Sequence, residues 1–565
     1  MRSLHVAWKN NRKGAKIKAL SRARELLPQA ADFQQWRRQP RRDVLAGVTV
    51  AMVALPLALA FGISSGLGAG AGIATAIVAG LVAAIFGGSN LQVSGPTGAM
   101  TVVLLPIFAR FGVDGVLVVG MMAGIILIAL SVMRAGRYVQ FIPLPVVEGF
   151  TLGIAFIIGL QQIPAALGES GEGEKIVSVA ASAARAWAAS PSWLAPAIAV
   201  GVAAAMLIGA RVRPGFPVSI VAVVGATALI SFTGLDIQVI GDIPRGLPAP
   251  GLPAFPLDQL SALLLPAIAV AALAALESLL SATVADAMSV GERHDSDREL
   301  FGQGLANIVT PLFGGVPATA AIARTAVNVR SGARSRLSAV TQSIVLLVVV
   351  LAAAQLVGRI PLAALAGVLI ATAIQMVKVS NLRGIIKATR ADAVVLVVTA
   401  AATIALDLVT AVLLGLAVAG IAALREVARS AHLEETPLDT RDHTAEEQDL
   451  LAEHVVAYRL EGSLFFGAAH TFLLELSAVN QVRVVILRMA RIQTLDATGA
   501  SVLAETIEQL EGRGITVLLS GIKPEHQRTL EQLGVYEQLA HERHVFTRTP
   551  DAIEHARRHV TRAPH

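Results

Sequence analysis

Two ionisable side chains lie inside apolar stretches where a membrane helix would normally exclude charge. Glu277 lies in Ala274-Ala-Leu-Glu-Ser-Leu-Leu-Ser281, and Arg324 closes the stretch that begins at Val316. A charge at this depth costs several kcal/mol unless it faces a cavity or a partner, so such residues indicate a substrate or proton pathway. Arg324 supplies a positive charge for an anion. Glu277 lies opposite it as a candidate carrier of a coupling proton, and Ser281 shares its helix face.

Each of these residues also has a plainer interpretation. Arg324 could reach the inner membrane surface together with Arg330. Glu277 could form only a structural ion pair with Arg324. In the functional interpretation, Glu277 exchanges its proton against that ion pair during transport.

Two Gly/Pro-interrupted segments supply the other part of the predicted anion site. Ile85-Phe-Gly-Gly88 precedes a segment that contains Pro96, and Leu312-Phe-Gly-Gly315 precedes one that contains Pro317. Proline suits a helix start because its missing N–H would be unpaired there anyway, so we expect Pro317 to begin a half-helix with Arg324 about two turns along it. Converging helix N-termini can hold an anion through free N–H groups and their partial positive charge. Two chance Phe-Gly-Gly turns are the alternative.

The elements that must position these residues are membrane helices. Of the 565 residues, 54% are hydrophobic and only 15% are charged, which is too apolar for a soluble chain of this length. From Val44 to about Leu424, apolar stretches repeat near the roughly 20 residues that a spanning helix needs. We count fourteen, with Pro56 expected to break the first. Seven spans per half place the two interrupted segments at matching positions of an inverted repeat, a pattern typical of transporter binding sites.

The charges between the predicted spans indicate the orientation. Loops expected inside hold Arg and Lys, such as Arg134 with Arg137 and Lys378 with Arg383, whereas one outer loop contains the acidic stretch Glu169-Ser-Gly-Glu-Gly-Glu174. This is the positive-inside pattern. An even number of spans then places both termini in the cytoplasm.

The remaining composition excludes several classes of function. Up to Asp43 the chain has twelve Lys/Arg against three acids and no apolar stretch typical of a signal peptide. We interpret it as a cytoplasmic segment that lies on anionic lipid, and a disordered tail without a role is the alternative. The net charge of +6 therefore does not predict nucleic-acid binding. The lack of cysteine excludes disulfides, thiolate metal sites and cysteine catalysis, and the lack of a Walker motif argues against ATP hydrolysis. We expect no metal and no cofactor. Transport would draw on a gradient of protons or sodium.

The composition divides the chain into four segments. We predict a basic cytoplasmic segment (1–43), a transmembrane domain (44–428), a charged linker (429–452) and an α/β domain (453–560). Strand-like and helix-like runs alternate in the last segment. The predicted strands are His454–Leu460, Val482–Leu487 and Ile515–Ser520, and the predicted helices are Ala468–Val479 and a second one that ends at Gly512.

Together these motifs resemble the sulfate permease family, the bacterial relatives of the solute carrier 26 anion transporters. The resemblance rests on Asp43-Val-Leu-Ala-Gly-Val-Thr-Val50, Ser94-Gly-Pro-Thr97, the Glu277 segment, Asn328-Val-Arg-Ser-Gly332 and the C-terminal domain. It implies an all-α membrane fold of fourteen helices in a seven-plus-seven inverted repeat. It also implies core and gate domains that move past each other in alternating access, and a homodimer.

The resemblance also implies roles for individual residues. Substrate contacts would come from Thr97, Ala321, Ile322 and Arg324, with Ala321 and Ile322 acting through backbone N–H groups, while Phe61 lines the pocket and Glu277 with Ser281 binds the coupling ion. Leu57 follows Pro56 where several members have Gln, so that polar contact is missing. An acid at position 277 occurs in proton-coupled and sodium-coupled members alike. Its combination with Arg324 looks more like the proton-coupled pattern.

The expected function is therefore secondary transport and not catalysis. Ala275–Leu280 and Ala318–Arg324 are especially similar to a branch that imports C4-dicarboxylates. We expect proton-coupled import of succinate or fumarate, or of sulfate, across a bacterial inner membrane. The alternatives are a sodium-coupled bicarbonate transporter, an uncoupled anion exchanger or channel, and a nucleobase transporter of a related fold.

The C-terminal domain is similar to the sulfate-transporter and anti-sigma-antagonist (STAS) domain. In the antagonists, an Asp-Ser pair at a helix start carries a phosphorylatable Ser, whereas here Asp496 is followed by Ala497. We expect Thr498 to cap that helix. A docking, oligomerisation or trafficking role with a cytoplasmic partner is therefore favoured over a phosphoswitch.

Overall fold

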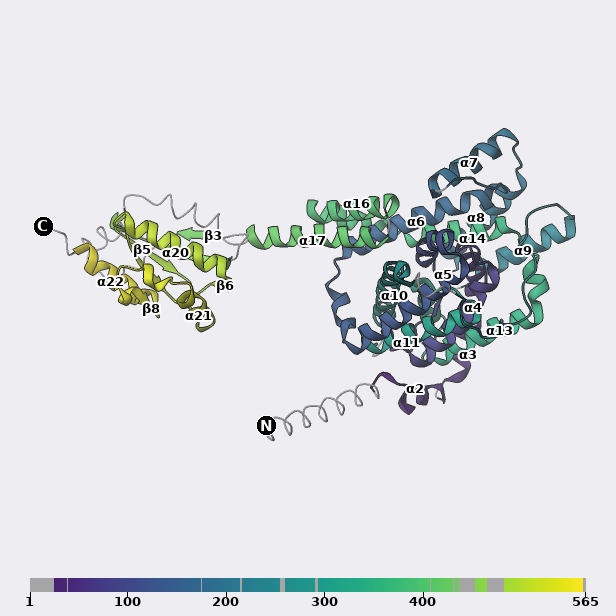
Figure 1. Cartoon of the computed structure of the whole chain (residues 1–565), viewed down its shortest axis with the longest axis horizontal. Coiled ribbons are helices and arrows are strands. Elements are labelled where there is room, and N and C mark those ends of the chain that lie inside the picture. Colours follow the sequence, from purple (N-terminus) through teal and green to yellow (C-terminus); the bar gives the residue numbers. More distant parts are fainter. Residues whose placement is uncertain are drawn as a thin grey trace. The chain divides into compact units, whose positions relative to one another are not determined.

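A computed structural model describes residues 25–37, 39–173, 175–213, 216–254, 260–289, 293–406, 408–429, 432–435, 453–464 and 482–561. The chain divides into two units, Met1–Leu416 and Ala417–His565. The first unit is a bundle of apolar helices, and the second contains a small sheet covered by helices (Figure 1).

Nine helical stretches of the described residues are long and apolar enough to cross a membrane. They are α3 (Pro40–Ser64), α4 (Ala69–Phe86), α5 (Gly98–Val132), α6 (Leu144–Leu167), α8 (Leu194–Val212), α10 (Leu260–Met288), α13 (Leu337–Gly358), α14 (Leu362–Met376) continued by α15 (Val379–Ala388), and α17 (Leu408–Arg429). Shorter helices are α2 (Ala30–Gln34), α7 (Ile176–Ala189), α9 (Val218–Thr233), α11 (Ser296–Val309), α12 (Ile322–Arg330) and α16 (Arg390–Ala405).

The long helix α5 contains two of the predicted spans. Gly112 inside it has a φ of 68° and a ψ of −166°, a conformation that glycine adopts without a Cβ clash, and the chain kinks there. The other predicted spans begin within a few residues of an observed helix, although α3 begins at Pro40 and α7 occupies a predicted outer loop. Because length and apolarity identify nine crossings in the described ranges, the count of fourteen stays a prediction.

The two interrupted segments meet as a short antiparallel ribbon. Strand β1 (Ser94–Gly95) pairs with β2 (Thr319–Ala320), and the helices α5 and α12 follow these strands. The prediction that Pro317 begins a half-helix is wrong, because the residues after it are held extended by pairing with β1. Arg324 is consequently the third residue of α12 and does not lie two turns along it.

Side chains from two neighbouring helices hold this ribbon. On α11, Asn307 Oδ1 accepts a hydrogen bond from the N–H of Ala318 at 2.8 Å, and its Nδ2 donates to the carbonyl of Ala318 at 2.9 Å. On α10, Ser278 Oγ accepts from the N–H of Ala320 at 3.2 Å. Unpaired backbone groups are costly in lipid, so these side chains make a non-helical segment tolerable at membrane depth.

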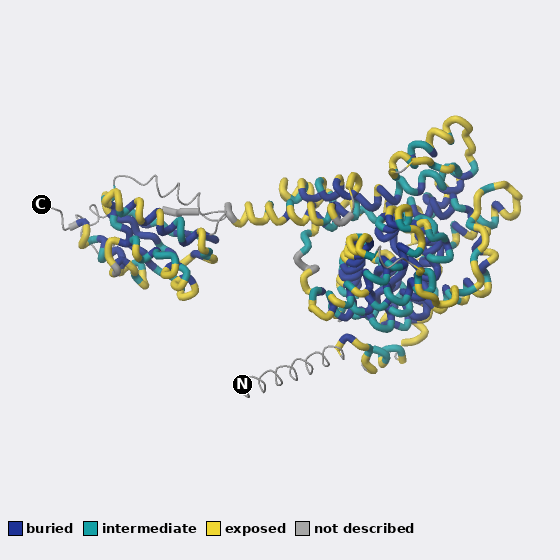
Figure 2. Tube along the Cα trace, in the orientation of Figure 1, coloured by how far each residue is buried: buried dark blue, intermediate teal, exposed yellow. Residues whose placement is uncertain are grey.

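The helices of the first unit form two packing groups. Helices α5, α10 and α11 pack together, as do α3, α4 and α13, and α4 also packs against α11. Helix α6 instead packs against α14, α16 and α7, and α14 against α8. This grouping fits the core and gate domains that the resemblance implies. Buried residues concentrate in the interior of the bundle and exposed residues on its outer helices (Figure 2).

The second unit is built on a sheet with the strand order β3-β4-β5-β7-β8, with β6 also pairing with β4. The strands are β3 (His432–Glu435), β4 (Val455–Leu464), β5 (Val484–Arg488), β6 (Ile492–Leu495), β7 (Thr516–Ser520) and β8 (Val545–Phe546). All pairings are parallel except β3 with β4. The helices are α20 (Ala497–Gly512), α21 (Pro524–Gln532) and α22 (Thr549–Thr561).

Burial of the central strand on both faces explains its continuous apolar sequence. Val485 and Leu487 pack in one apolar cluster with α20, whereas Val484 and Ile486 pack in another with α22. A parallel strand covered by helices on both faces has this pattern. The alternation predicted from sequence is therefore confirmed for β4, β5, α20 and β7.

Strand β3 falls within the segment predicted as a linker, where it pairs antiparallel with Tyr458–Glu461 of β4. The predicted helix Ala468–Val479 lies outside the described residues.

Removing the Asn307 side chain should destabilise the helical unit. Asn307→Ala leaves the buried N–H and C=O of Ala318 without partners, at a cost of roughly 1–3 kcal/mol for each group. We expect a lower melting temperature of the purified protein in detergent. Val348→Ala, which shortens an exposed side chain on α13, is the control and should leave the melting temperature nearly unchanged. Equal melting temperatures for both variants would contradict this role of Asn307.

Candidate functional site

Thr97 joins the start of α5 to the acid on α10. It is the N-cap residue of α5, and its Oγ1 accepts a hydrogen bond from the N–H of Met100 at 3.4 Å. The same hydroxyl donates to Glu277 Oε2 at 2.8 Å. A capping hydroxyl leaves its proton available to a second partner, and here that partner is the predicted coupling residue.

Arg324 is buried at the junction of the two half-helices, with 1% of its surface exposed. Its Nη2 donates to the carbonyl of Pro96 at 2.8 Å, directly after β1. Its Nη1 is buried and has no hydrogen-bond partner among the described residues. Arg324 therefore does not extend to the membrane surface beside the exposed Arg330, and it keeps one donor unused.

Glu277 lies near Arg324 without pairing with it directly. Opposite charges on the two side chains attract each other, but in the described part of the chain no ion pair joins them. Each makes a separate hydrogen bond, Glu277 to Thr97 and Arg324 to Pro96. Among the described residues, this conformation therefore contains no direct ion pair between Glu277 and Arg324.

The first turn of α12 offers backbone donors at the same junction. Ile322 and Ala323 are exposed, and neither N–H has a backbone partner within the described ranges. Ala321 differs from the prediction, because its N–H donates to the carbonyl of Val93 at 3.0 Å. Residue 321 is still extended and continues the pairing between the two segments, so its N–H is not free for an anion.

The other predicted site residues occupy supporting positions. Ser281 is fully buried one turn after Glu277, and its Oγ donates to Thr325 Oγ1 at 3.0 Å. Phe61 is 5% exposed and packs beside the start of α5, since a Cβ added to Gly98 would lie 3.1 Å from its ring. Pro56 lies inside α3, which continues past it, so the expected break is wrong. Ser281 thus ties α10 to α12, and Phe61 positions the N-terminus of α5.

Sequence reasoning missed a second layer of polar side chains on α11. Glu299 is 2% exposed, and its Oε2 accepts from the N–H of Gly88 at 2.9 Å. Gln303 Nε2 donates to Glu299 Oε1 at 3.0 Å and to Ser94 Oγ at 2.6 Å. The available signal was the spacing of Glu299, Gln303 and Asn307, which places all three on one helix face.

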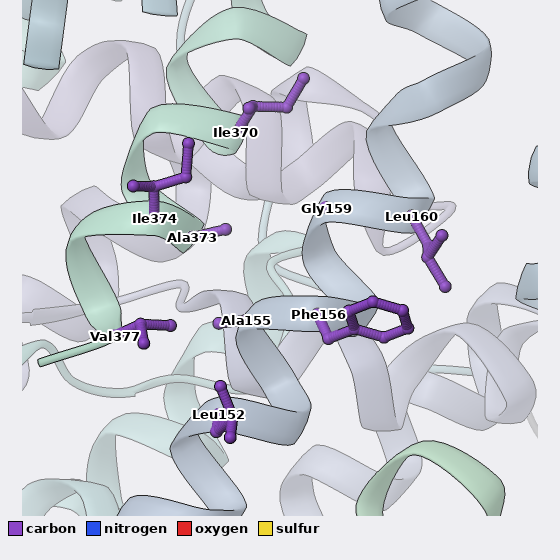
Figure 3. A pocket seen from close by; sticks show the side chains of 9 residues that line it. All are labelled: Leu152, Ala155, Phe156, Gly159, Leu160, Ile370, Ala373, Ile374 and Val377. Atoms are coloured by element: carbon purple, nitrogen blue, oxygen red, sulfur yellow. The ribbon is translucent and has the colours of Figure 1, made fainter. Parts of the chain in front are cut away.

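An apolar hollow lies elsewhere in the helical unit. It measures about 300 Å³ and is lined by α6 and α14 residues, as Figure 3 shows: Leu152, Ala155, Phe156, Gly159, Leu160, Ile370, Ala373, Ile374 and Val377. None of these side chains carries a polar group that could hold an anion. The candidate site therefore remains the junction of α5, α10 and α12.

In the second unit, helix α20 is capped by a residue other than the predicted one. Asp496 is the N-cap, and its side chain accepts a hydrogen bond from the N–H of Gly499 at 2.7 Å. Thr498 is exposed within the first turn and does not cap the helix. The carboxylate is the better acceptor for a helix N-terminus because it also interacts favourably with the helix dipole.

Comparison with known proteins gives two family matches. Residues 41–399 match the sulfate permease family, and residues 449–552 match the STAS domain. The chain is 33% identical to the putative sulfate transporter YvdB of Bacillus subtilis, over 90% of this chain and 96% of that protein. It is also 33% identical to the bicarbonate transporter BicA of Synechocystis, over 87% of this chain and 90% of that protein.

Two solved structures have a similar fold. The transmembrane domain of a cyanobacterial bicarbonate transporter BicA is 35% identical, with a TM-score of 0.59, over 68% of this chain and 97% of that chain. The structure of SLC26A9 has a TM-score of 0.79 over 97% of this chain and 94% of that chain. At 18% identity the second likeness concerns the fold alone.

Placing a methyl group on Gly95 should disturb the buried guanidinium. A Cβ there would lie 2.6 Å from Arg324 Nη1, and the φ of 151° disfavours an L side chain. We expect Gly95→Ala to destabilise the protein by about 1–3 kcal/mol, as overpacking of a core does, and to lower its melting temperature. Gly159→Ala is the matched control, because its Cβ would meet no atom within 4 Å. A melting temperature as high as that of the control would show that Arg324 is not fixed against β1.

Proposed function

The chain belongs to the sulfate permease family, and from this premise we propose that it is a proton-coupled importer of small dianions that works by alternating access. It is an anion transporter with a STAS domain and not an enzyme. The proposal is supported above all by one observation: Thr97, Glu277 and Arg324 converge where the two half-helices begin. An anion at this point would meet the free N–H groups of α12 and the positive ends of both helices.

The charges of the site suggest how binding and protonation are coupled. With Glu277 protonated, Arg324 and the helix ends together favour a dianion. With Glu277 ionised, its negative charge opposes the bound anion across a medium of low dielectric constant. Proton and anion therefore favour each other's binding, and this coupling is reciprocal. Sulfate and C4-dicarboxylates such as succinate or fumarate are the dianions we propose.

A second candidate is sodium-coupled transport of bicarbonate. It is favoured by relatives that are named bicarbonate transporters and that match most of this chain. The hydroxyl of Thr97 and the carboxylate of Glu277 are oxygen ligands of the kind that a hard cation prefers. An uncoupled exchanger on the same fold would need neither ion.

The cellular arrangement follows from the same proposal. We place the protein in a bacterial inner membrane as a homodimer, with both termini in the cytoplasm. The distribution of Lys and Arg between the predicted spans supports this orientation. The STAS domain would then be available to a cytoplasmic partner.

Uptake into proteoliposomes tests the function directly. Labelled succinate, sulfate and bicarbonate are offered separately, with an inward proton gradient, an inward sodium gradient or no gradient. Saturable uptake of a dianion that only the proton gradient drives is expected. Sodium-driven uptake of bicarbonate would favour the second candidate, and uptake indifferent to both gradients would indicate an uncoupled pathway.

Neutralising the acid should separate coupling from translocation. Glu277→Gln keeps an oxygen that can accept from Thr97 but removes the ionisable group. We expect the variant to lose proton-driven accumulation while it retains exchange of internal for external anion. The control is Glu148→Gln, which changes a buried acid on α6 that binds Asn381 instead. Intact proton-driven accumulation by Glu277→Gln would refute the coupling role.

Removing the buried guanidinium should weaken anion uptake. A hydrogen bond to a charged group contributes about 1.5–3 kcal/mol, so Arg324→Ala should reduce uptake roughly 10- to 100-fold. Arg324→Lys keeps the charge and should recover part of that loss. Arg330→Ala removes an exposed Arg from the end of the same helix and should transport normally. Size-exclusion profiles check that each variant is folded, and wild-type uptake by folded Arg324→Ala would exclude Arg324 from the site.

A further inference from the structure

Three histidines of the second unit gather between the end of the sheet and its last helix. His544 ends the 3-10 turn Glu542–His544, immediately before β8, and His555 and His559 lie one turn apart on α22. The ring centroid of His544 lies 5.4 Å from that of His555 and 5.3 Å from that of His559. The centroids of His555 and His559 are 5.0 Å apart. Helix α22 packs on β5 and β7, so the apolar core fixes where these rings meet.

The spacing of the ring nitrogens suits a metal ion. One nitrogen from each of the three histidines lies within 4.8 Å of the others, and His555 Nε2 is 3.2 Å from His559 Nε2. A tetrahedral zinc ion with Zn–N bonds of 2.0–2.1 Å separates its ligand nitrogens by about 3.4 Å. Two histidines four residues apart on a helix present their nitrogens on one face, a spacing that zinc sites use.

His544 has a buried nitrogen that the protein leaves unused. Its side chain is 4% exposed, and its Nδ1 has no hydrogen-bond partner among the described residues. An unsatisfied buried polar atom calls for an explanation, and a bound ion is a common one.

We propose that His544, His555 and His559 bind one divalent transition metal ion, with zinc as the best match and water as the fourth ligand. Imidazole nitrogen suits zinc and its neighbours, whereas magnesium and calcium prefer oxygen ligands. The metal would tie the C-terminal helix to the turn before β8. This departs from the sequence-based expectation of no metal site, because His544 and the pair on α22 are brought together only by the fold. The inference is independent of which anion is transported.

Metal binding by the full-length chain tests the proposal. The protein is purified in detergent through an affinity tag that contains no histidine, stripped with a chelator, and titrated with Zn²⁺ against a chromophoric competitor. We expect one Zn²⁺ per chain. Co²⁺ in the same site should produce the visible absorption of a tetrahedral complex.

Two variants and a control decide where the ion binds. Loss of a residue that only orients a metal ligand lowers metal affinity 10- to 100-fold. His559→Ala removes a ligand itself, so it should lower the zinc affinity about 100-fold or more. His559 is exposed, so this variant should fold, and His555→Ala provides an independent second case. His454→Asn changes a histidine before β4 and should bind like the wild type. Failure of the wild type to bind Zn²⁺, or wild-type zinc affinity in His559→Ala and in His555→Ala, would overturn the proposal.

Discussion

Within a bilayer each backbone N–H and C=O needs a partner inside the protein, and the candidate site depends on how the chain meets this need at its two interrupted helices. Pairing of β1 with β2 satisfies the groups between the interruptions and the helix starts. Side chains of Asn307 and Ser278 bind groups that the two strands cannot reach. Within the described residues, the N–H groups of Ile322 and Ala323 in the first turn of α12 have no backbone partner, so donors are available beside Arg324.

The two buried charges are likewise each held by a partner inside the protein. Arg324 and Glu277 attract each other, yet each is held by a neutral partner, the Pro96 carbonyl and the Thr97 hydroxyl. A direct pair would satisfy both charges and leave little for a ligand. Held apart, Arg324 retains an unused donor at Nη1 and Glu277 remains partly exposed. Electrostatic pre-organisation of this kind lets a site bind an anion without first breaking a strong internal contact.

Local signals in the sequence placed most of the helices and singled out residues that the fold brings together. Apolar length placed the predicted spans near observed helices, and the cost of burying charge singled out Glu277 and Arg324. Two errors were local, the expected break at Pro56 and the expected cap at Thr498, and the others concern non-local contacts. Proline chemistry suggested a helix at Pro317, but pairing with Ser94 and Gly95, more than two hundred residues away, holds that segment extended. Likewise, nothing local in the sequence reveals that Glu299 binds the backbone of Gly88.

The distance along the chain between the two halves of the ribbon has a consequence for how the protein is made. Val93 donates its N–H to Thr325 Oγ1, and 232 residues separate the two. At a synthesis rate of about 5–20 residues per second, the first half waits roughly 10–50 seconds for its partner to leave the ribosome. During that interval the polar backbone of β1 has to stay in contact with water or with the insertion machinery. Pairing of β1 can therefore be completed only after the second ribbon strand has been translated.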